Sequence, residues 1–222
     1  MTNWSVKTGG LIETRLEVEL MKIKVCGFTQ AQNAHDAAML GIDAIGLVFY
    51  EKSPRCVDTQ QAREIVQALP PFVSRVGLFV NADSDFIDEV LCEVPLDTLQ
   101  FHGDETPQQC AQYAMPFIKA LRMQSTTDLR ALSEDYHQAS GLLLDAFSQE
   151  AYGGTGEQFD WSLAKADIDL PIILAGGMNA QTVSAAIAQV NPYAVDVSSG
   201  VESAKGVKDI AKIQEFIQQV RS

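Results

Sequence analysis

From Met21 onward, short apolar runs alternate with stretches of helical periodicity, and this alternation limits the folds open to the chain more than any other feature. Such a rhythm is typical of βα units that build a parallel sheet. The runs expected to form strands are Ile23–Cys26, Ala44–Phe49, Arg75–Val80, Thr98–His102, Phe117–Leu121, Leu142–Asp145, Ile172–Ala175 and Ala194–Ser198. The helices expected after them are Gln32–Leu40, Gln60–Leu69, Asp85–Val90, Gln108–Tyr113, Leu129–Gln138, Ser162–Ala166, Ala180–Gln189 and Lys208–Gln219.

Eight βα units within about 200 residues predict an α/β protein with a single (β/α)8 TIM barrel of eight parallel strands. An open doubly wound sheet is the main alternative. It is disfavoured because Cys26-Gly27-Phe28-Thr29 follows the first strand, where a dinucleotide-binding sheet would carry G-x-G-x-x-G. Two helix starts support the assignment: Asp58 with Gln61 resembles a capping box, and Asn179 precedes the helix after the seventh strand.

Residues 1–20 stand outside this rhythm, because they contain Gly9-Gly10 followed by alternating charges. We expect an N-terminal extension that is not part of the barrel, or translation from an upstream start codon, with residues 21–222 forming the catalytic barrel domain. A short extra strand or helix that caps the floor of the barrel is the alternative.

Charge narrows the range of partners. Lys and Arg number 16 against 29 Asp and Glu, giving a formal net charge of -13. This balance opposes binding to nucleic acid or to an anionic membrane surface. A small anionic substrate remains compatible with it, because backbone N–H groups and one or two basic side chains can bind a phosphate locally.

The cysteines and histidines give no sign of a metal site. The four cysteines form no C-x-x-C pair, and the three histidines lie far from them in the sequence. No apolar stretch approaches the roughly 20 residues needed to cross a bilayer. We therefore expect a cytoplasmic protein with reduced thiols and no metal.

Three turns rich in small residues follow the last three expected strands. They contain Gly154 and Gly156 after the sixth strand, Gly176 and Gly177 after the seventh, and Ser198 and Ser199 at the end of the eighth. Only small residues let backbone N–H groups approach phosphate oxygens closely, and barrels of this kind often hold a phosphate beside the last two strands. The sequence therefore predicts a phosphorylated small-molecule substrate.

Cys26 and Asp145 end the first and sixth strands, which face each other across an eight-stranded ring. They are the candidate base and acid of a proton-transfer reaction. The alternatives are a small core thiol for Cys26 and a loop anchor for Asp145. Pro54 restricts the backbone before Arg55, so the Arg55 guanidinium is a candidate for bidentate binding of a carboxylate or phosphate. The alternative is an ordinary surface arginine.

Together with Gln100 and His102 at the end of the fourth strand, these residues closely resemble the phosphoribosylanthranilate isomerases of tryptophan biosynthesis. The resemblance runs in order from Lys22 nearly to the C-terminus. The segments that carry it are Lys24-Val25-Cys26-Gly27, Asp43-Ala44-Ile45-Gly46, Lys52-Ser53-Pro54-Arg55, Gln100-Phe101-His102-Gly103, Leu143-Leu144-Asp145, Gly153-Gly154-Thr155-Gly156, Leu174-Ala175-Gly176-Gly177 and Asp196-Val197-Ser198-Ser199-Gly200-Val201-Glu202. Cys56, Phe101 and the first 20 residues depart from the family pattern.

The resemblance implies an Amadori rearrangement of N-(5-phosphoribosyl)anthranilate that needs no cofactor. It makes Asp145 the general acid that opens the ribose ring and Cys26 the general base that removes the C2 proton. It places Arg55 against the anthranilate carboxylate and the late turns around the phosphate. Gln100 and His102 are expected to contact the substrate, and the protein is expected to be a monomer or homodimer.

Two other functions remain open. The first is another phosphosugar isomerase, epimerase or lyase on the same barrel. The absence of a second inward carboxylate matched to Asp145, or of metal-ligand histidines, counts against the epimerases. The second is a catalytically silent barrel that binds a phosphorylated metabolite. The presence of both Cys26 and Asp145 disfavours it.

Strand alternation also places Lys24 and Asp196 one layer below the mouth of the barrel, on strands that become neighbours when the barrel closes. Buried charges of opposite sign are expected to pair. A free thiol, with a pKa of about 8.5, is mostly protonated at neutral pH and gains from a nearby cation. We hypothesise that this pair favours the Cys26 thiolate; a purely structural bridge is the alternative.

Overall fold

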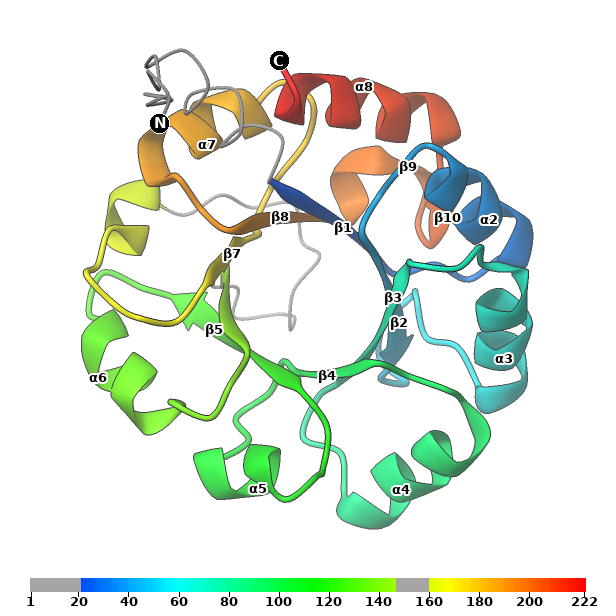
Figure 1. Cartoon of the computed structure of the whole chain (residues 1–222), viewed down its shortest axis with the longest axis horizontal. Coiled ribbons are helices and arrows are strands. Elements are labelled where there is room, and N and C mark those ends of the chain that lie inside the picture. Colours follow the sequence, from blue (N-terminus) through cyan, green and yellow to red (C-terminus); the bar gives the residue numbers. More distant parts are fainter. Residues whose placement is uncertain (1–20, 147–159) are drawn as a thin grey trace, which may run out of the picture.

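A computed structural model describes residues 21–146 and 160–222 of the chain. Its parallel strands form one closed ring of eight in sequence order, and β8 pairs back onto β1 (Figure 1). The strands are β1 (Lys22–Cys26), β2 (Ala44–Phe49), β3 (Ser74–Phe79), β4 (Thr98–Phe101), β5 (Phe117–Met123), β6 (Gly141–Ala146), β7 (Ile172–Leu174) and β8 (Ala194–Val197). The predicted (β/α)8 barrel is confirmed, with strand ends within two residues of those expected.

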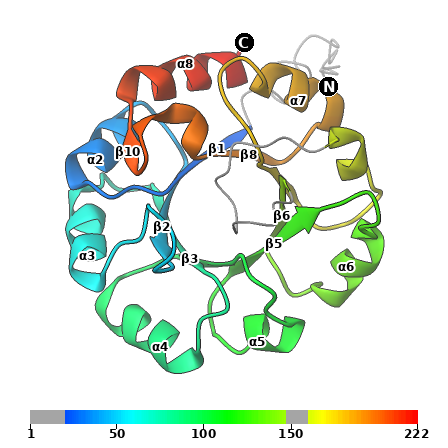
Figure 2. The ribbon, with the colours of Figure 1, turned by 180° about the vertical axis from the view of Figure 1, so that it is seen from behind.

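The helices form an outer ring around the strands, as the view from behind also shows (Figure 2). They are α2 (Ala31–Met39), α3 (Thr59–Ala68), α4 (Ser84–Glu93), α5 (Pro107–Ala111), α6 (Leu129–Asp135), α7 (Val183–Val190) and α8 (Ile210–Val220). Short 3-10 helices occur at η1 (Trp161–Ala164) and η2 (Ser199–Val201). Where an α-helix was expected over Ser162–Ala166, the chain instead makes the single turn η1, capped by Asp160.

Local capping explains where several helices begin. The capping box of Asp58 and Gln61 starts α3 as predicted, because each side chain accepts a hydrogen bond from the other residue's backbone N–H. Asn179 does not directly cap α7. Its side chain accepts from the backbone N–H groups of Gln181 and Thr182, so it closes a turn before the helix begins at Val183.

The core has an outer layer, between strands and helices, and an inner one. The interior of the barrel holds an apolar cluster of Ile118, Ala120, Leu143, Ile173, Ala175 and Ala194. A second inner cluster joins Cys26 to Val48, Leu78 and Val80. Inward-facing side chains from alternate strands fill such a barrel in layers, so these clusters form the base and one wall of its mouth.

A hairpin after β8 was not expected from the sequence. Strands β9 (Glu202–Ala204) and β10 (Val207–Lys208) pair antiparallel, and Gly206 turns the chain with a φ of +79°. The carbonyl of Gly206 accepts a 2.6 Å hydrogen bond from the Thr29 hydroxyl. A Cβ on Gly206 would lie 2.9 Å from the carbonyl oxygen of Pro54. The hairpin therefore packs against the loops that follow β1 and β2.

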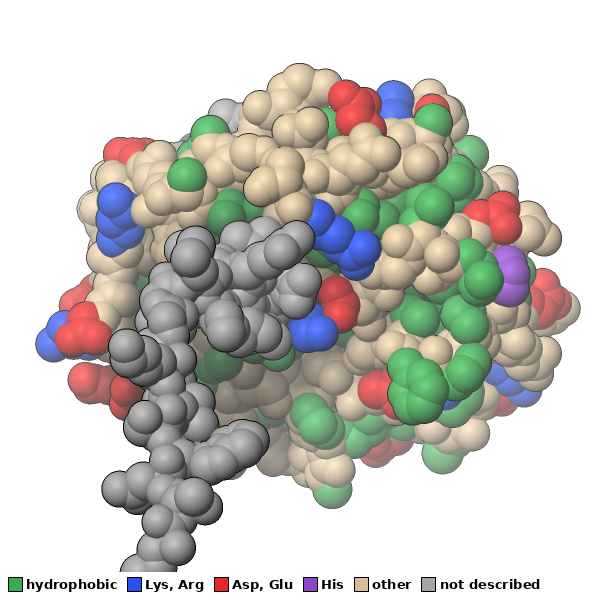
Figure 3. Space-filling model, turned by 45° about the horizontal axis from the view of Figure 1, so that its top comes forward, with side chains coloured by type: hydrophobic (Ala, Val, Ile, Leu, Met, Phe, Trp, Pro, Cys, Tyr) green, Lys and Arg blue, Asp and Glu red, His purple; other side chains and the backbone are tan. Residues whose placement is uncertain are grey.

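Basic and acidic side chains are interspersed on the face drawn in Figure 3, with no large cluster of one sign. Among the helices in residues 21–146 and 160–222, none is both long and apolar enough to span a membrane. The predicted extension over residues 1–20 lies outside the described residues.

Candidate active site

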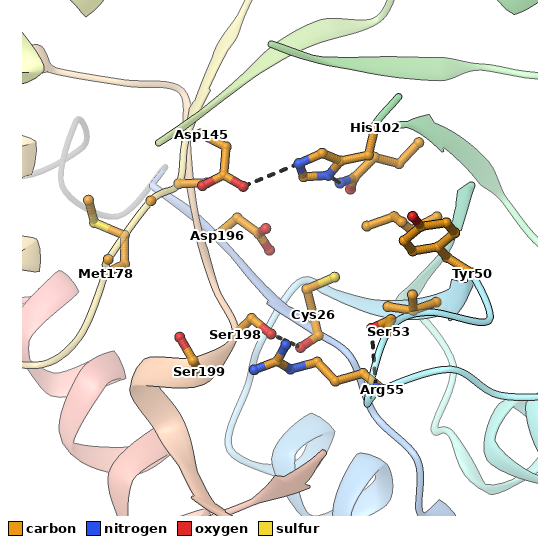
Figure 4. Close-up of a pocket in the computed structure, with 16 residues that line it drawn as sticks. Cys26, Tyr50, Ser53, Arg55, His102, Asp145, Met178, Asp196, Ser198 and Ser199 are labelled. Atoms are coloured by element: carbon orange, nitrogen blue, oxygen red, sulfur yellow. Dashed lines mark hydrogen bonds and ion pairs between the residues drawn. The ribbon is translucent and has the colours of Figure 1, made fainter. Parts of the chain in front are cut away.

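A cavity that is open to solvent lies at the carboxyl ends of the strands. Its lining combines inward-facing strand ends and the loops after them, as Figure 4 shows. Most of the predicted site residues meet here: Cys26, Arg55, Gln100, His102, Asp145, Gly176, Gly177, Ser198 and Ser199. Gly154 and Gly156 were also predicted, and both lie outside the described residues.

Cys26 ends β1 with its sulfur directed into the cavity (Figure 4). The residue is 5% exposed. Space for the sulfur depends on Gly46 of β2, because a Cβ at that position would lie 2.5 Å from Cys26 Sγ. Burial raises the pKa of the Cys26 thiol, Lys24 and Lys208 offset part of this rise, and Asp196 adds to it. The nearby cations therefore reduce the effect of burial without reversing it.

Lys24 and Asp196 form the predicted ion pair in the barrel interior. Lys24 Nζ lies 2.8 Å from Asp196 Oδ1, and both side chains are less than one-tenth exposed. Burial disfavours the ammonium, but Asp196 and Cys26 together raise the pKa of Lys24. Burial raises the pKa of Asp196, and Lys24 counteracts it. The pair is confirmed; its effect on the thiol stays a hypothesis.

Asp196 also corrects an expectation. A second inward carboxylate near Asp145 was thought to be absent, yet Asp196 lines the same cavity. The sequence places it a layer lower, and its side chain nevertheless lines the cavity. Because Lys24 binds one of its oxygens, Asp196 is not a free second acid or base.

Asp145 is the penultimate residue of β6 and is held by two donors. Its Oδ1 accepts a 2.8 Å hydrogen bond from the N–H of Ala146, and its Oδ2 lies 3.2 Å from His102 Nε2. Gln100 Nε2 lies 3.0 Å from His102 Nδ1, and an amide nitrogen donates there. This contact leaves the imidazole proton on Nε2, facing Asp145. His102 is therefore a buried partner of the candidate acid.

Arg55 is buried, so the alternative of an ordinary surface arginine is wrong. Its Nε donates to Glu202 Oε1 at 2.7 Å and its Nη2 to Glu202 Oε2 at 2.9 Å. Lys208 Nζ lies 2.8 Å from Glu202 Oε1. Glu202 is the last residue of the segment Asp196–Glu202 that resembles the family. The sequence did not indicate a role in the site for Glu202 or for Lys208. The contacts of Glu202 and Lys208 depend on the β9–β10 hairpin, and no local sequence pattern predicts this hairpin.

Of the two described small-residue turns, the one after β7 has a backbone conformation that favours glycine. Gly176 and Gly177 have φ of +77° and +64°, in the region that side chains disfavour. Ser198 Oγ donates to the carbonyl of Cys26 at 2.9 Å, and Ser199 opens η2 beside the cavity. Within the described ranges, no group of three metal-ligating side chains is placed to hold a metal ion.

The model of the N-(5'-phosphoribosyl)anthranilate isomerase family matches residues 23–219. Proteins of that name from Pseudomonas putida (strain GB-1) and Stutzerimonas stutzeri (strain A1501) are 57% and 56% identical, covering 90% and 91% of this chain and 98% of each relative. The solved isomerase from Thermotoga maritima is 38% identical, with a TM-score of 0.83 over 90% of this chain and 98% of that one.

A second solved phosphoribosylanthranilate isomerase is in complex with reduced 1-(o-carboxyphenylamino)-1-deoxyribulose 5-phosphate. It is 37% identical, with a TM-score of 0.79, and covers 90% of this chain and 98% of its own. The closed parallel barrel and the residues gathered at its mouth agree with these matches, which extend over nearly the whole described barrel. The chain therefore belongs to the N-(5'-phosphoribosyl)anthranilate isomerase family.

Proposed function

We propose that this chain catalyses the Amadori rearrangement of N-(5-phosphoribosyl)anthranilate to 1-(2-carboxyphenylamino)-1-deoxyribulose 5-phosphate in tryptophan biosynthesis. The observation that carries the proposal is the meeting of Cys26 and Asp145, from β1 and β6, in one cavity. A reaction that moves protons between carbon and oxygen needs one acid and one base, and no cofactor. The family membership of the chain supports the same reaction.

Asp145 is the proposed general acid. In its protonated form it gives a proton to the ribose ring oxygen while the bond between that oxygen and C1 breaks. The nitrogen lone pair then forms the C1–N double bond of a Schiff base. The N–H groups of Ala146 and His102, which face the two carboxyl oxygens, stabilise the carboxylate that remains.

Cys26 is the proposed general base. Its thiolate removes the proton from C2, and the electron pair of the broken C–H bond moves to form the enol-amine. The enol-amine relaxes to the ketone by losing its hydroxyl proton and gaining one at C1. Return of a proton from the thiol to the Asp145 carboxylate through solvent restores both groups for the next turnover.

The ends of the substrate are anionic, and the cavity offers matching donors. We propose that Gly176, Gly177, Ser198 and Ser199 bind the phosphate, with Gly154 and Gly156 outside the described residues completing the cradle. Arg55 Nη1 is left for the anthranilate carboxylate, because Nε and Nη2 already bind Glu202.

Gln100 is the proposed partner of a ribose hydroxyl. Its Oε1 is buried and has no hydrogen-bond partner among the described residues, while its Nε2 contacts His102. A buried acceptor without a donor is costly, and a ligand hydroxyl would satisfy it. His102 then shapes the same wall of the site.

We also propose that residues 21–222 form the catalytic domain and that it works in the cytoplasm. Of the two oligomeric forms expected, we propose the homodimer. One solved relative is described as monomers generated from a dimeric phosphoribosylanthranilate isomerase. In this chain, the Phe72 side chain is fully exposed beside Pro70 and Pro71. Light scattering that gives the mass of one chain would contradict the homodimer.

Turnover of N-(5-phosphoribosyl)anthranilate by the purified chain tests the proposed function. We expect saturable conversion to the deoxyribulose product without an added metal or nicotinamide. The alternative of a silent phosphometabolite-binding barrel predicts binding of ribose 5-phosphate with no conversion. That result would overturn the proposal.

A further inference from the structure

Glu202 lies between two buried cations at the edge of the candidate site. Its side chain is 6% exposed, while those of Arg55 and Lys208 are 9% and 0% exposed. Burial alone would raise the pKa of Glu202, but its hydrogen bonds to Arg55 and Lys208 hold it below its ordinary value. Glu202 is therefore a carboxylate that accepts from both cations at once.

The two cations come from different elements and have different further contacts. Arg55 comes from the loop after β2, and both Glu202 oxygens hold its guanidinium in a fork. Lys208 comes from β10, and besides Glu202 Oε1 it contacts Ser198 O at 3.2 Å and Ser198 Oγ at 3.4 Å. Ser198 is in turn bonded to the carbonyl of Cys26. One chain of contacts thus runs from Arg55 to the turn after β8.

The charges of this group also favour an anion nearby. Two cations and one carboxylate leave one positive charge, and no other carboxylate of the described residues contacts the three side chains. Burial lowers the pKa of Lys208, and Glu202 acts against that change. An unbalanced positive charge is costly in a buried setting, and a bound anion would balance it.

We propose that Glu202 is a positioning residue that couples the carboxylate-binding end of the site to its phosphate-binding end. It fixes the Arg55 guanidinium for the anthranilate carboxylate and, through Lys208, fixes Ser198 for the phosphate. The inference rests on the proposed function, which assigns the carboxylate to Arg55 and the phosphate to the turn at Ser198.

The hairpin is also held by contacts that do not involve the Glu202 carboxylate. The backbone carbonyl of Glu202 accepts from Lys212 Nζ at 2.7 Å, and the Asp209 N–H donates to Val201 O at 2.8 Å. The Thr29 hydroxyl holds Gly206 on the other side. We therefore expect Glu202→Gln to fold. In that variant the buried Lys208 ammonium loses its counter-ion and sheds its proton more easily, so the positive charge at the site does not increase.

The test measures the two halves of the substrate separately by calorimetry, with ribose 5-phosphate for the phosphate end and anthranilate for the carboxylate end. In Glu202→Gln we expect both dissociation constants to rise about tenfold, the usual effect of losing a hydrogen bond to a charged group. Asp97→Asn is the matched control. Asp97 also forms a fork with an arginine, Arg75, but lies away from the cavity, so neither constant should change.

A second variant tests the coupling itself. The double variant Lys208→Met, Glu202→Gln is compared with the single variant Lys208→Met. The double variant should bind anthranilate more weakly than the single variant, but the two should bind ribose 5-phosphate equally well. An effect on anthranilate alone in the single Glu202→Gln variant would show that Glu202 serves only Arg55 and would overturn the coupling. Unchanged or tighter binding of both ligands would overturn the whole inference. The proposed function fails separately, if the unaltered chain does not convert its substrate.

Discussion

Lys24 and Asp196 stand opposite each other in the register of β1 and β8 and form a 2.8 Å ion pair inside the barrel, below the Cys26 thiol. Both side chains are less than one-tenth exposed, so each charge depends on the other for compensation. The pair brings a cation to the underside of the candidate base, in a layer where apolar side chains would otherwise meet.

The first prediction concerns this cation. In a background with Cys56, Cys92 and Cys110 changed to Ser, replacing Lys24 by Met together with Asp196 by Asn should raise the pKa of Cys26, because Lys24 lowers that pKa more than Asp196 raises it. Thiolate absorbance in the ultraviolet measures this. Lys22→Met, on the same strand but half-exposed and paired with Asp43, is the control. An unchanged Cys26 pKa would leave the pair a purely structural role.

The second prediction concerns the acid and the base. Asp145→Asn and Cys26→Ala should each fold and lower kcat by at least ~10², the usual contribution of a positioned acid or base. Steady-state turnover measures the loss, and circular dichroism checks the fold. Cys92→Ser, at an exposed cysteine, is the control. A variant that retains near-normal turnover would remove its residue from the mechanism.

The third prediction separates binding from chemistry at Arg55. Arg55→Ala should act mainly by raising KM, because a carboxylate contact is shared by the bound substrate and the transition state. The Glu202 carboxylate retains Lys208 as its partner in this variant, so the fold should persist. Full kinetic curves measure both constants. Were KM to stay the same, Arg55 would not contact the substrate.

The fourth prediction is a pH dependence of stability. Arg55 and Lys208 hold the pKa of Glu202 below its ordinary value of 4.5. The Glu202 charge therefore stabilises the fold at and above that pH, and the contribution is lost as pH falls further, through the depressed folded pKa. Urea unfolding should show the parent more stable than Glu202→Gln at pH 7, with a gap that narrows below pH 4.5. A gap that widens in acid would contradict the direction of the shift.

The fifth prediction concerns residues 1–20. A chain that starts at Met21 should keep full activity, because the first βα unit, β1 with α2, is complete from Lys22 onward. Turnover and thermal unfolding of the shortened chain measure this. Failure of the shortened chain to fold would show that the segment packs on the barrel.

Local patterns in the sequence were enough to predict the barrel and much of the site. Strand ends fix which residues reach the mouth, so the cavity contains Cys26, His102 and Asp145 as expected. The pairing of Lys24 with Asp196 followed from alternation and ring closure. These predictions depend only on the period of a strand and on the order of the strands.

The missed features arise from contacts between distant parts of the chain. Glu202 lies 147 residues from its partner Arg55, and nothing near either residue indicates their contact. The hairpin that brings Glu202 there is too short to show a strand pattern. Likewise, the His102 contact with Asp145 joins strand ends 43 residues apart, and only side-chain geometry determines it.

The absent side chain at Gly46 has a consequence for how this barrel could change. A single methyl group there would lie 2.5 Å from the Cys26 sulfur and 3.0 Å from the Cys26 Cα, too close for either atom. The space that the Cys26 thiol fills therefore depends on the absence of a side chain at Gly46 of β2. Substitutions that alter the specificity of this enzyme can be made in the loops. Gly46, on the strand beside β1, has to remain glycine so that the Cys26 thiol keeps its position.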